Sequence, residues 1–342
     1  MRHFPIPRVH AVDRRLPAAV AIIAAAALVA PVSAQDSTPA PAGSPGPEPS
    51  GLTAPTESGL DRIELPDAWQ PEGIALLDDQ LFVGSLADGA IWRADPLTGE
   101  GSIFVPGTEG AVAVGLEADE ANGRLWVAGG ATGEVRVYAA DGAELLETYR
   151  FEAGFLNDLV ATPEAVYVTD SFMPQILVVP LHEDGSLPAP DQGRVLPISG
   201  ELEYGDGFNA NGIVAAPAGL IVVHSSAGEL FRVDPASGVS SRIDLGDATV
   251  SAGDGMELDG DTLYVVRNQL NQIAVLELDE GATSATQVAE LGDDGFDVPT
   301  TVALRGDDLW AVNARFGTEA TPDTEYWVTR LDAAPADGDP GS

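Results

Sequence analysis

Short apolar stretches recur along most of the chain, and each is bounded by Gly, Asp, Asn or Pro. The first group of them runs through four stretches: Gly73–Leu77, Leu81–Ser85, Ala90–Asp95 and Ser102–Val105. Val, Ile, Leu and aromatic residues dominate these stretches, which is typical of β-strands separated by tight turns. The apolar positions do not follow the 3.6-residue period of an amphipathic helix, so a helical repeat is excluded.

This four-strand unit occurs six times. The first positions of the successive units are spaced 42 to 54 residues apart, at Glu72, Gly115, Asn157, Asn211, Asp254 and Thr300. A repeat of about 40–50 residues with four short strands is the signature of propeller blades. The sequence therefore predicts an all-β, six-bladed β-propeller with four-stranded blades.

The two ends of the repeat region predict how the ring closes. The sixth unit contains Thr301–Leu304, Leu309–Val312 and Trp327–Leu331 and has no fourth strand. The strand-like segment Asp61–Leu65 lies before the first unit and belongs to none. We expect it to supply the outer strand of the last blade, because this closure removes an exposed sheet edge.

The remaining parts of the chain have a different character. Residues 1–34 combine four arginines, an apolar run and a small-residue end, which predicts a cleaved signal peptide rather than a retained membrane anchor. Residues 35–59 and 333–342 are rich in Pro, Ser, Ala and Gly, so we expect a disordered linker and tail around a propeller at 60–332. This interpretation predicts a protein that is secreted or periplasmic and is not attached to a membrane after the signal peptide is cleaved.

The amino-acid composition excludes several classes of function. The formal net charge is −38, and all 16 basic residues are Arg. Such a surface repels nucleic acid and anionic membranes. Attraction of cations would also use the charge, but solubility outside the cell is the favoured explanation for most of it. The chain has no Cys, which excludes disulfides and thiol catalysis, and its few His residues cannot form a zinc cage.

Oxygen-bearing side chains open four of the six inner strands. These are Glu72, Asn157, Asn211 and Asp254, from units one, three, four and five. In a propeller the inner strands surround the axis, so two carboxylates and two amide oxygens would converge there. Hard divalent cations prefer such ligands, and the number of protein oxygens favours calcium over magnesium or manganese.

A simpler explanation exists for the same residues. Asn-Gly and Asp-Gly are favourable turn dipeptides, and others occur out of register, such as Asn122-Gly123 and Asp141-Gly142. The shared phase of the four oxygen-bearing positions within the repeat favours the metal site.

A second set of residues follows the second strand of each unit, at the same face. His224 would either move a proton or only hydrogen-bond locally, and Arg315 would either bind a carboxylate or neutralise the acidic rim. The expected substrate-binding residues here are Asp170, Asn268, Asn313 and Arg315.

The ordered set Pro71-Glu72-Gly73, Asn157-Asp158, Asn211-Gly212 and Asp254-Gly255-Met256 resembles the gluconolactonase and regucalcin family of six-bladed propellers, and more distantly the paraoxonases. The resemblance covers about residues 60–331. It implies one catalytic divalent ion, usually calcium, held by Glu72, Asn157, Asn211 and Asp254, and hydrolysis of lactones or related esters. Sugar-lactone members carry Arg where this chain has Phe155, which favours a less polar substrate.

The sequence thus predicts a monomeric, secreted, metal-dependent hydrolase of a small-molecule lactone or ester. Asp254 is the first candidate for the general base, with Asp158 and His224 as further candidates. The alternative is a non-catalytic propeller that binds a ligand or partner and uses the metal structurally. A carbohydrate-active propeller would need aromatic platforms and a carboxylate pair that the sequence does not place.

Overall fold

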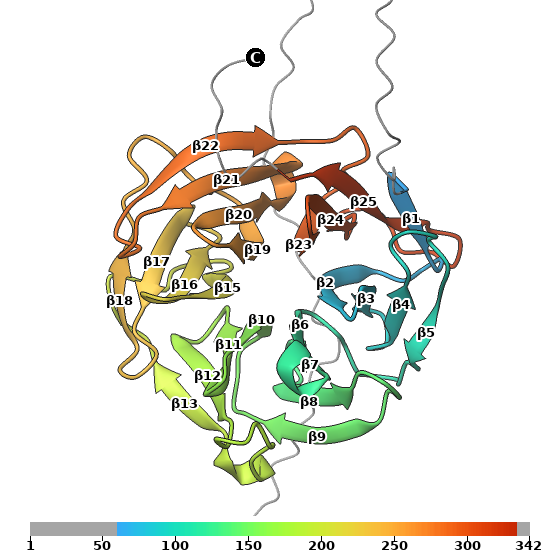
Figure 1. The fold of residues 1–342 in the computed structure, drawn as a ribbon, viewed down its shortest axis with the longest axis horizontal. Helices are drawn as coiled ribbons and strands as arrows, with labels where there is room; N and C mark the ends of the chain where they lie inside the picture. Colours follow the sequence, from blue (N-terminus) through green and yellow to red (C-terminus); the bar gives the residue numbers. More distant parts are fainter. Residues whose placement is uncertain (1–59, 334–342) are drawn as a thin grey trace, which may run out of the picture. The chain divides into compact units, whose positions relative to one another are not determined.

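The computed structural model describes residues 60–333, and these residues form six antiparallel sheets arranged as blades around an axis (Figure 1). The predicted all-β, six-bladed propeller is therefore confirmed. The signal peptide and linker predicted within residues 1–59, and nearly all of the predicted tail, lie outside the described residues. None of the helices in the described part is long and apolar enough to cross a membrane.

The strands of each blade run outward from the axis in sequence order, except that the outermost strands of the fourth and sixth blades come from earlier in the chain. The first three blades are built from β2 (Pro71–Leu77), β3 (Gln80–Ser85), β4 (Ile91–Ala94) and β5 (Gly101–Val105); β6 (Leu116–Asp119), β7 (Arg124–Ala128), β8 (Glu134–Ala139) and β9 (Leu145–Arg150); and β10 (Leu156–Ala161), β11 (Ala165–Asp170), β12 (Gln175–Pro180) and β13 (Arg194–Pro197). Two 3₁₀ turns lie in this half, η1 (Glu120–Asn122) and η2 (Pro190–Gln192).

The other three blades follow the same order. They are built from β15 (Ala210–Ala216), β16 (Gly219–His224), β17 (Glu229–Val233) and β18 (Val239–Arg242); β19 (Gly253–Asp259), β20 (Thr262–Arg267), β21 (Gln272–Leu278) and β22 (Ala285–Leu291); and β23 (Pro299–Arg305), β24 (Asp308–Asn313), β25 (Tyr326–Asp332) and β1 (Arg62–Leu65). The 3₁₀ turn η3 spans Asn268–Leu270. The fourth blade gains a fifth strand, β14 (Ser199–Gly200), which pairs in parallel with β18.

The last blade closes the ring as the sequence predicted. Strand β1 pairs antiparallel with β25, with Ile63 opposite Val328, so the outermost strand of the sixth blade comes from the start of the propeller. The main chain continues this pairing, because the Arg330 amide donates to the Asp61 carbonyl at 2.9 Å. The first and last segments of the domain are thereby held together.

The hydrophobic core is divided among the blade interfaces. Six clusters of buried residues each join two neighbouring sheets, and the cluster between the sixth and first blades includes Ile63, Trp69, Trp310 and Val328. Burial of the faces between blades is what holds adjacent sheets at a fixed angle around the axis. The inner strands β2, β6, β10, β15, β19 and β23 therefore face one another across the centre (Figure 1).

Candidate functional site

The four predicted ligand positions share one backbone feature. In β2, β10, β15 and β19 the pairing with the next strand shifts by one residue, for example between Pro71 and Ile74 and between Leu156 and Leu159. A β-bulge of this kind redirects a side chain that a regular strand would place elsewhere. The bulges contain Glu72, Asn157, Asn211 and Asp254, which are 7, 3, 5 and 4% exposed. We call these four residues the axial site.

Strand pairing also corrects one position of the repeat. Leu116 pairs with Val127 as Ile74 pairs with Val83, so the residue of the second blade that corresponds to Glu72 is Val114 and not Gly115. The axial positions of the second and sixth blades are therefore Val114 and Thr300, and the second blade contributes an apolar side chain.

The glycines of these motifs serve the packing between blades. A Cβ on Gly73 would lie 2.2 Å from the Val114 carbonyl oxygen, and one on Gly212 would lie 2.2 Å from the Asp254 carbonyl oxygen. Neither glycine is placed by a positive φ. Close approach of the neighbouring inner strand thus requires glycine here. This packing explains why Gly73 and Gly212 are glycines. It does not explain the identity of the residues before them, Glu72 and Asn211.

Hydrogen bonds orient the two asparagine side chains. The Asn157 amide Nδ2 donates to Ser171 Oγ at 2.9 Å, and Ser171 Oγ in turn donates to the Ala210 carbonyl at 2.7 Å. Because each serine hydroxyl has one proton, an oxygen that donates to a carbonyl accepts from the asparagine, which must then present its NH₂ group. The Asn157 Oδ1 atom is therefore directed away from the serine.

The fourth blade repeats this arrangement. The Asn211 amide donates to Ser225 Oγ at 3.0 Å, and Ser225 donates to the Gly253 carbonyl. Sequence reasoning missed both serines. A detectable signal was present, because Ser171 and Ser225 each follow their asparagine by 14 residues.

Asp254 is held by a residue at the same offset. Asn268 Nδ2 donates to Asp254 Oδ2 at 2.7 Å across an interval of 14 residues. Asn268 was predicted to bind substrate, and the structure places it beside Asp254 as a hydrogen-bond donor. The corresponding residue of the first blade is Leu86, and within residues 60–333 no donor hydrogen-bonds the Glu72 carboxylate. Only the Glu72 carbonyl is held, by Thr300 Oγ1 at 2.7 Å.

Burial makes negative charge at this site unfavourable. It raises the pKa of Asp254 to about 7, an effect that the amides of Asn268 and Asn211 partly oppose. Burial also raises the pKa of Glu72 well above its usual value, and the charges of Asp254 and Asp158 add to that increase. No ion pair to Glu72 or Asp254 occurs in the described part of the chain. A cation at the axial site would therefore stabilise the ionised form of both carboxylates.

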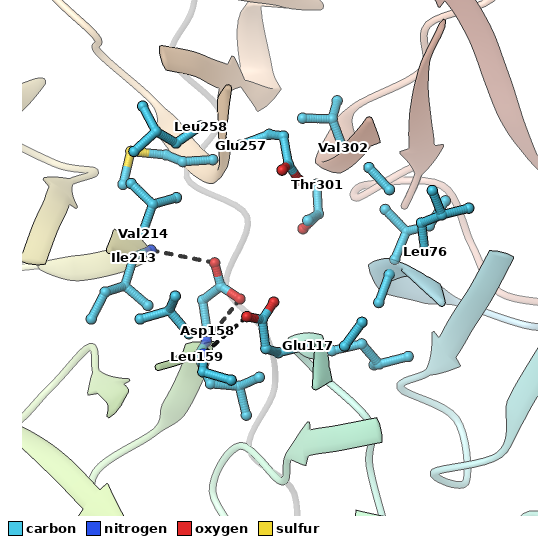
Figure 2. A pocket seen from close by; sticks show the side chains of 18 of the residues that line it. Leu76, Glu117, Asp158, Leu159, Ile213, Val214, Glu257, Leu258, Thr301 and Val302 are labelled. Carbon is cyan, nitrogen blue, oxygen red and sulfur yellow. Dashed lines mark hydrogen bonds between the residues drawn. The ribbon is translucent and has the colours of Figure 1, made fainter. Parts of the chain in front are cut away.

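A cavity of about 340 Å³ lies along the axis and is lined by residues of all six inner strands. Figure 2 shows Asp158, Glu117 and Glu257 pointing into it. Burial raises the pKa of Asp158 to about 7 and that of Glu257 to about 8, and raises the pKa of Glu117 well above its usual value. The sequence analysis missed Glu117 and Glu257, although a carboxylate within an apolar inner strand was a visible signal.

Asp158 faces this cavity and is already hydrogen-bonded. Its Oδ1 accepts from the Leu159 amide at 2.9 Å and its Oδ2 accepts from the Ile213 amide at 3.4 Å (Figure 2). Both bonds favour the carboxylate form, against the effect of burial. In residues 60–333 no group of three or more His, Cys, Asp or Glu is arranged to hold a metal ion. A cation site on the axis therefore depends on the asparagine oxygens as well as on Glu72 and Asp254.

His224 occupies a structural position away from the axis. Its Nε2 lies 3.1 Å from the Glu203 carbonyl, and its Nδ1 accepts from the Ala227 amide at 3.2 Å. Both ring nitrogens are engaged, and the ring lines a separate pocket with Glu203, Phe231 and Arg242. This hydrogen bonding argues against the expected catalytic role of His224.

Asp170, Asn313 and Arg315 also support local structure. Asn313 is fully buried and donates to Thr329 Oγ1 at 3.0 Å, while Arg315 pairs with Asp297 at 2.8 Å. Asp170 is fully buried as well and accepts hydrogen bonds from the backbone of two loops. Asn313 and Asp170 are therefore occupied by local hydrogen bonds, and Arg315 is held by Asp297 and the Glu325 carbonyl. Phe155, which was also expected to bind substrate, packs against Val114, and its ring contacts two other phenylalanines.

Comparison with known proteins supports the fold. A family model described as strictosidine synthase-like, N-terminal, matches residues 58–94, which include Glu72. This match covers a small part of the chain, so it supports a propeller family without assigning the chain to a particular one. No curated protein matches.

Solved structures share the architecture at low sequence identity. The Malassezia sympodialis allergen Mala s 1 is 17% identical, with a TM-score of 0.61 over 80% of this chain and 96% of that chain. Virginiamycin B lyase from Staphylococcus aureus is 13% identical, with a TM-score of 0.55 over 79% and 99%. A Lactobacillus plantarum protein is 17% identical, with a TM-score of 0.51 over 77% and 85%. These similarities show the fold alone and do not support assignment to the gluconolactonase, regucalcin or paraoxonase families.

Proposed function

We propose that this protein is an exported, divalent-metal-dependent hydrolase of a lactone or related ester, with the metal at the axial site. The observation that carries the proposal is a pair of buried carboxylates, Glu72 and Asp254, that have no cationic partner among residues 60–333. Buried charges in proteins are normally paired or bound to metals. The hydrogen-bonded orientation of Asn157 and Asn211 adds two amide oxygens that accept no hydrogen bond within residues 60–333.

The donor set fits calcium. Calcium binds carboxylate and amide oxygens, and two carboxylates balance its charge. Glu72, Asn157, Asn211 and Asp254 would hold the ion, with Ser171, Ser225 and Asn268 holding three of those side chains in place. A bound divalent ion polarises a carbonyl oxygen and lowers the pKa of a nearby water. Comparing the affinities of the protein for calcium, magnesium and manganese identifies which of these ions the site prefers.

The residues of the chain have separable roles in this proposal. Asp254 is the candidate base as well as a ligand of the ion. Burial raises its pKa to about 7 in the metal-free protein, and a bound cation would lower that pKa and keep the carboxylate ionised to accept a proton. Asn268 holds the Asp254 carboxylate and fixes its orientation. Asp158 is less suited to this role, since backbone amides occupy both of its oxygens.

The resemblance of the four axial motifs to gluconolactonases supports ester chemistry, and Phe155 in place of Arg favours an apolar substrate over a sugar acid. The match of residues 58–94 to a strictosidine synthase-like model agrees with a propeller family and does not identify the reaction. The export signal predicted in residues 1–34 supports action outside the cytoplasm.

The experiment that tests this function is hydrolysis of a panel of γ- and δ-lactones and aryl esters, measured before and after treatment with a chelator. We expect activity that is lost with the chelator and restored by calcium. The double variant Glu72→Gln/Asp254→Asn removes both axial charges and should be inactive, whereas Asp141→Asn, in an exposed turn, should retain activity. Full activity in the double variant contradicts the proposal.

A non-catalytic, ligand-binding propeller with a structural metal is the second candidate. The engagement of both His224 nitrogens favours it, because it leaves few free groups for proton transfer. In that case calcium removal lowers the melting temperature of the protein, and no lactone or ester is turned over.

A further inference from the structure

Three phenylalanine rings meet at one place on the surface. Phe155 precedes β10, Phe172 follows β11 and Phe208 precedes β15. Their ring centroids are 6.1 Å apart for Phe155 and Phe172, 5.8 Å for Phe155 and Phe208, and 5.0 Å for Phe172 and Phe208. We call these three residues the phenylalanine cluster.

The cluster lies beside the axial site. Phe155 comes two residues before Asn157, and Phe208 comes three residues before Asn211. Phe172 directly follows Ser171, the residue that holds the Asn157 amide. The three rings are thus carried by the same strand ends that position the two asparagines.

The apolar surface continues across the second blade. Phe155 packs in one cluster with Val112 and Val114, and Val114 is the apolar counterpart of Glu72. The opposite side of the site is polar, because Asn268 and Asp254 belong to the fifth blade. The second-blade side of the axial site is therefore apolar and the fifth-blade side polar, which gives a bound ligand a preferred orientation.

Two of the rings are exposed to solvent. Phe172 is 49% exposed and Phe208 is 39% exposed, and no other aromatic side chain in residues 60–333 is as accessible. Exposed apolar surface close to buried polar side chains is typical of a ligand-binding region.

Buried polar residues hold the cluster rigidly. Asp170 Oδ1 accepts hydrogen bonds from the backbone amides of both Phe155 and Phe172, each at 3.0 Å. Asn209 is 2% exposed and donates to the carbonyls of Ser171 at 2.9 Å and Gly207 at 2.9 Å, which fixes the loop before Phe208. The rings are thus presented in a set geometry before any ligand arrives, which lowers the entropy lost on binding.

We propose that the phenylalanine cluster is an apolar subsite that binds the alkyl or aryl group of an uncharged lactone or ester whose carbonyl lies at the axial site. The inference rests on the proposed function and names its substrate class. A second copy of this chain is disfavoured as the occupant, because two molecules that each carry a net charge of −38 repel one another. An anionic ligand is disfavoured for the same reason.

The test is the chain-length dependence of binding, measured by calorimetry with γ-octalactone and γ-dodecalactone in the presence of a chelator. Each methylene buried on an apolar surface contributes up to about fourfold in affinity. We expect the longer lactone, with four more methylenes, to bind the unmodified protein at least about tenfold more tightly. In Phe172→Ser/Phe208→Ser the two lactones should differ by less than about threefold.

Two variants control for general effects. Phe172→Leu/Phe208→Leu keeps the apolar character and should keep most of the chain-length dependence. Leu145→Ser removes an apolar side chain that is 50% exposed on β9, the outermost strand of the second blade, and should bind both lactones as the unmodified protein does.

The outcomes separate this inference from the proposed function. Chain-length dependence without any turnover in calcium supports the subsite and contradicts the hydrolase. Turnover in calcium with equal affinity for both lactones overturns the subsite and leaves the hydrolase standing. Equal affinity together with self-association that the serine variant abolishes also overturns the subsite, since the cluster is then an interface between copies.

Discussion

Replacing Asp254 with asparagine should stabilise the metal-free protein, although Asp254 belongs to the proposed working site. In the unfolded chain this carboxyl has its ordinary pKa of 3.8, and in the folded protein burial raises the pKa to about 7. A group with a raised pKa favours the folded state only while it is protonated. The carboxylate therefore destabilises the metal-free fold increasingly as the pH rises from about 4 to about 7.

The magnitude follows from the two pKa values. At pH 8 Asp254 is ionised in both states, and the difference between 3.8 and about 7 corresponds to about 4 kcal/mol of lost stability. At pH 5 the folded form is protonated and the unfolded form is ionised, so the loss is about 2 kcal/mol. Asn in this position avoids the charge and can still accept the hydrogen bond from Asn268.

The assay is urea unfolding followed by tryptophan fluorescence, in chelator, at pH 5 and pH 8. We expect the free energy of unfolding of Asp254→Asn to be higher than that of the unmodified protein by about 4 kcal/mol at pH 8 and by about 2 kcal/mol at pH 5. Asp141→Asn makes the same change on an exposed turn and is the control. Calcium should then reverse the order at pH 8, because the ion stabilises the protein that binds it. A variant that is less stable than the unmodified protein in chelator at pH 8 would refute the reasoning.

Two further predictions concern the supports of the fold and the site. Ser171→Ala removes the acceptor of the Asn157 amide and should weaken calcium binding about 10- to 100-fold. The buried hydroxyl also donates to the Ala210 carbonyl, so the free energy of unfolding should fall by about 1–3 kcal/mol. Unchanged calcium affinity by calorimetry would show that the serine does not orient the ligand. Ile63 is 1% exposed in β1, so Ile63→Ala should create a cavity where the ring closes and lower the free energy of unfolding by about 2–5 kcal/mol. A loss below about 0.5 kcal/mol in urea unfolding would show that β1 does not contribute to ring closure.

The sequence was sufficient for the architecture because the strand signal repeats. Alternating turns and β-branched runs identified six blades, and the unassigned segment Asp61–Leu65 identified the closing strand. Spacing alone could not resolve the second blade, where the axial residue is Val114. The strand pairing, which sets Leu116 opposite Val127, identifies Val114 as the equivalent position.

Site residues that share a position in the repeat were predictable from the sequence. The roles of residues whose contacts depend on loop conformation were less predictable. Glu72, Asn157, Asn211 and Asp254 lie at equivalent bulges, as their common position indicated. His224 and Asp170 also followed the repeat, yet their roles depend on loop conformations that bring the Glu203 carbonyl and the Phe172 amide to them. The contact of Phe208 with Phe155 joins segments far apart in the sequence, and no local pattern predicts it.

The central claim is that Glu72, Asn157, Asn211 and Asp254 hold one divalent cation on the axis. Calcium titration calorimetry of chelator-treated protein at pH 8 tests it most directly, with Glu72→Gln/Asp254→Asn in parallel. We expect one equivalent of calcium to bind the unmodified protein and none to bind the double variant. Equal calcium binding by the two proteins, or no binding by the unmodified protein, would contradict it.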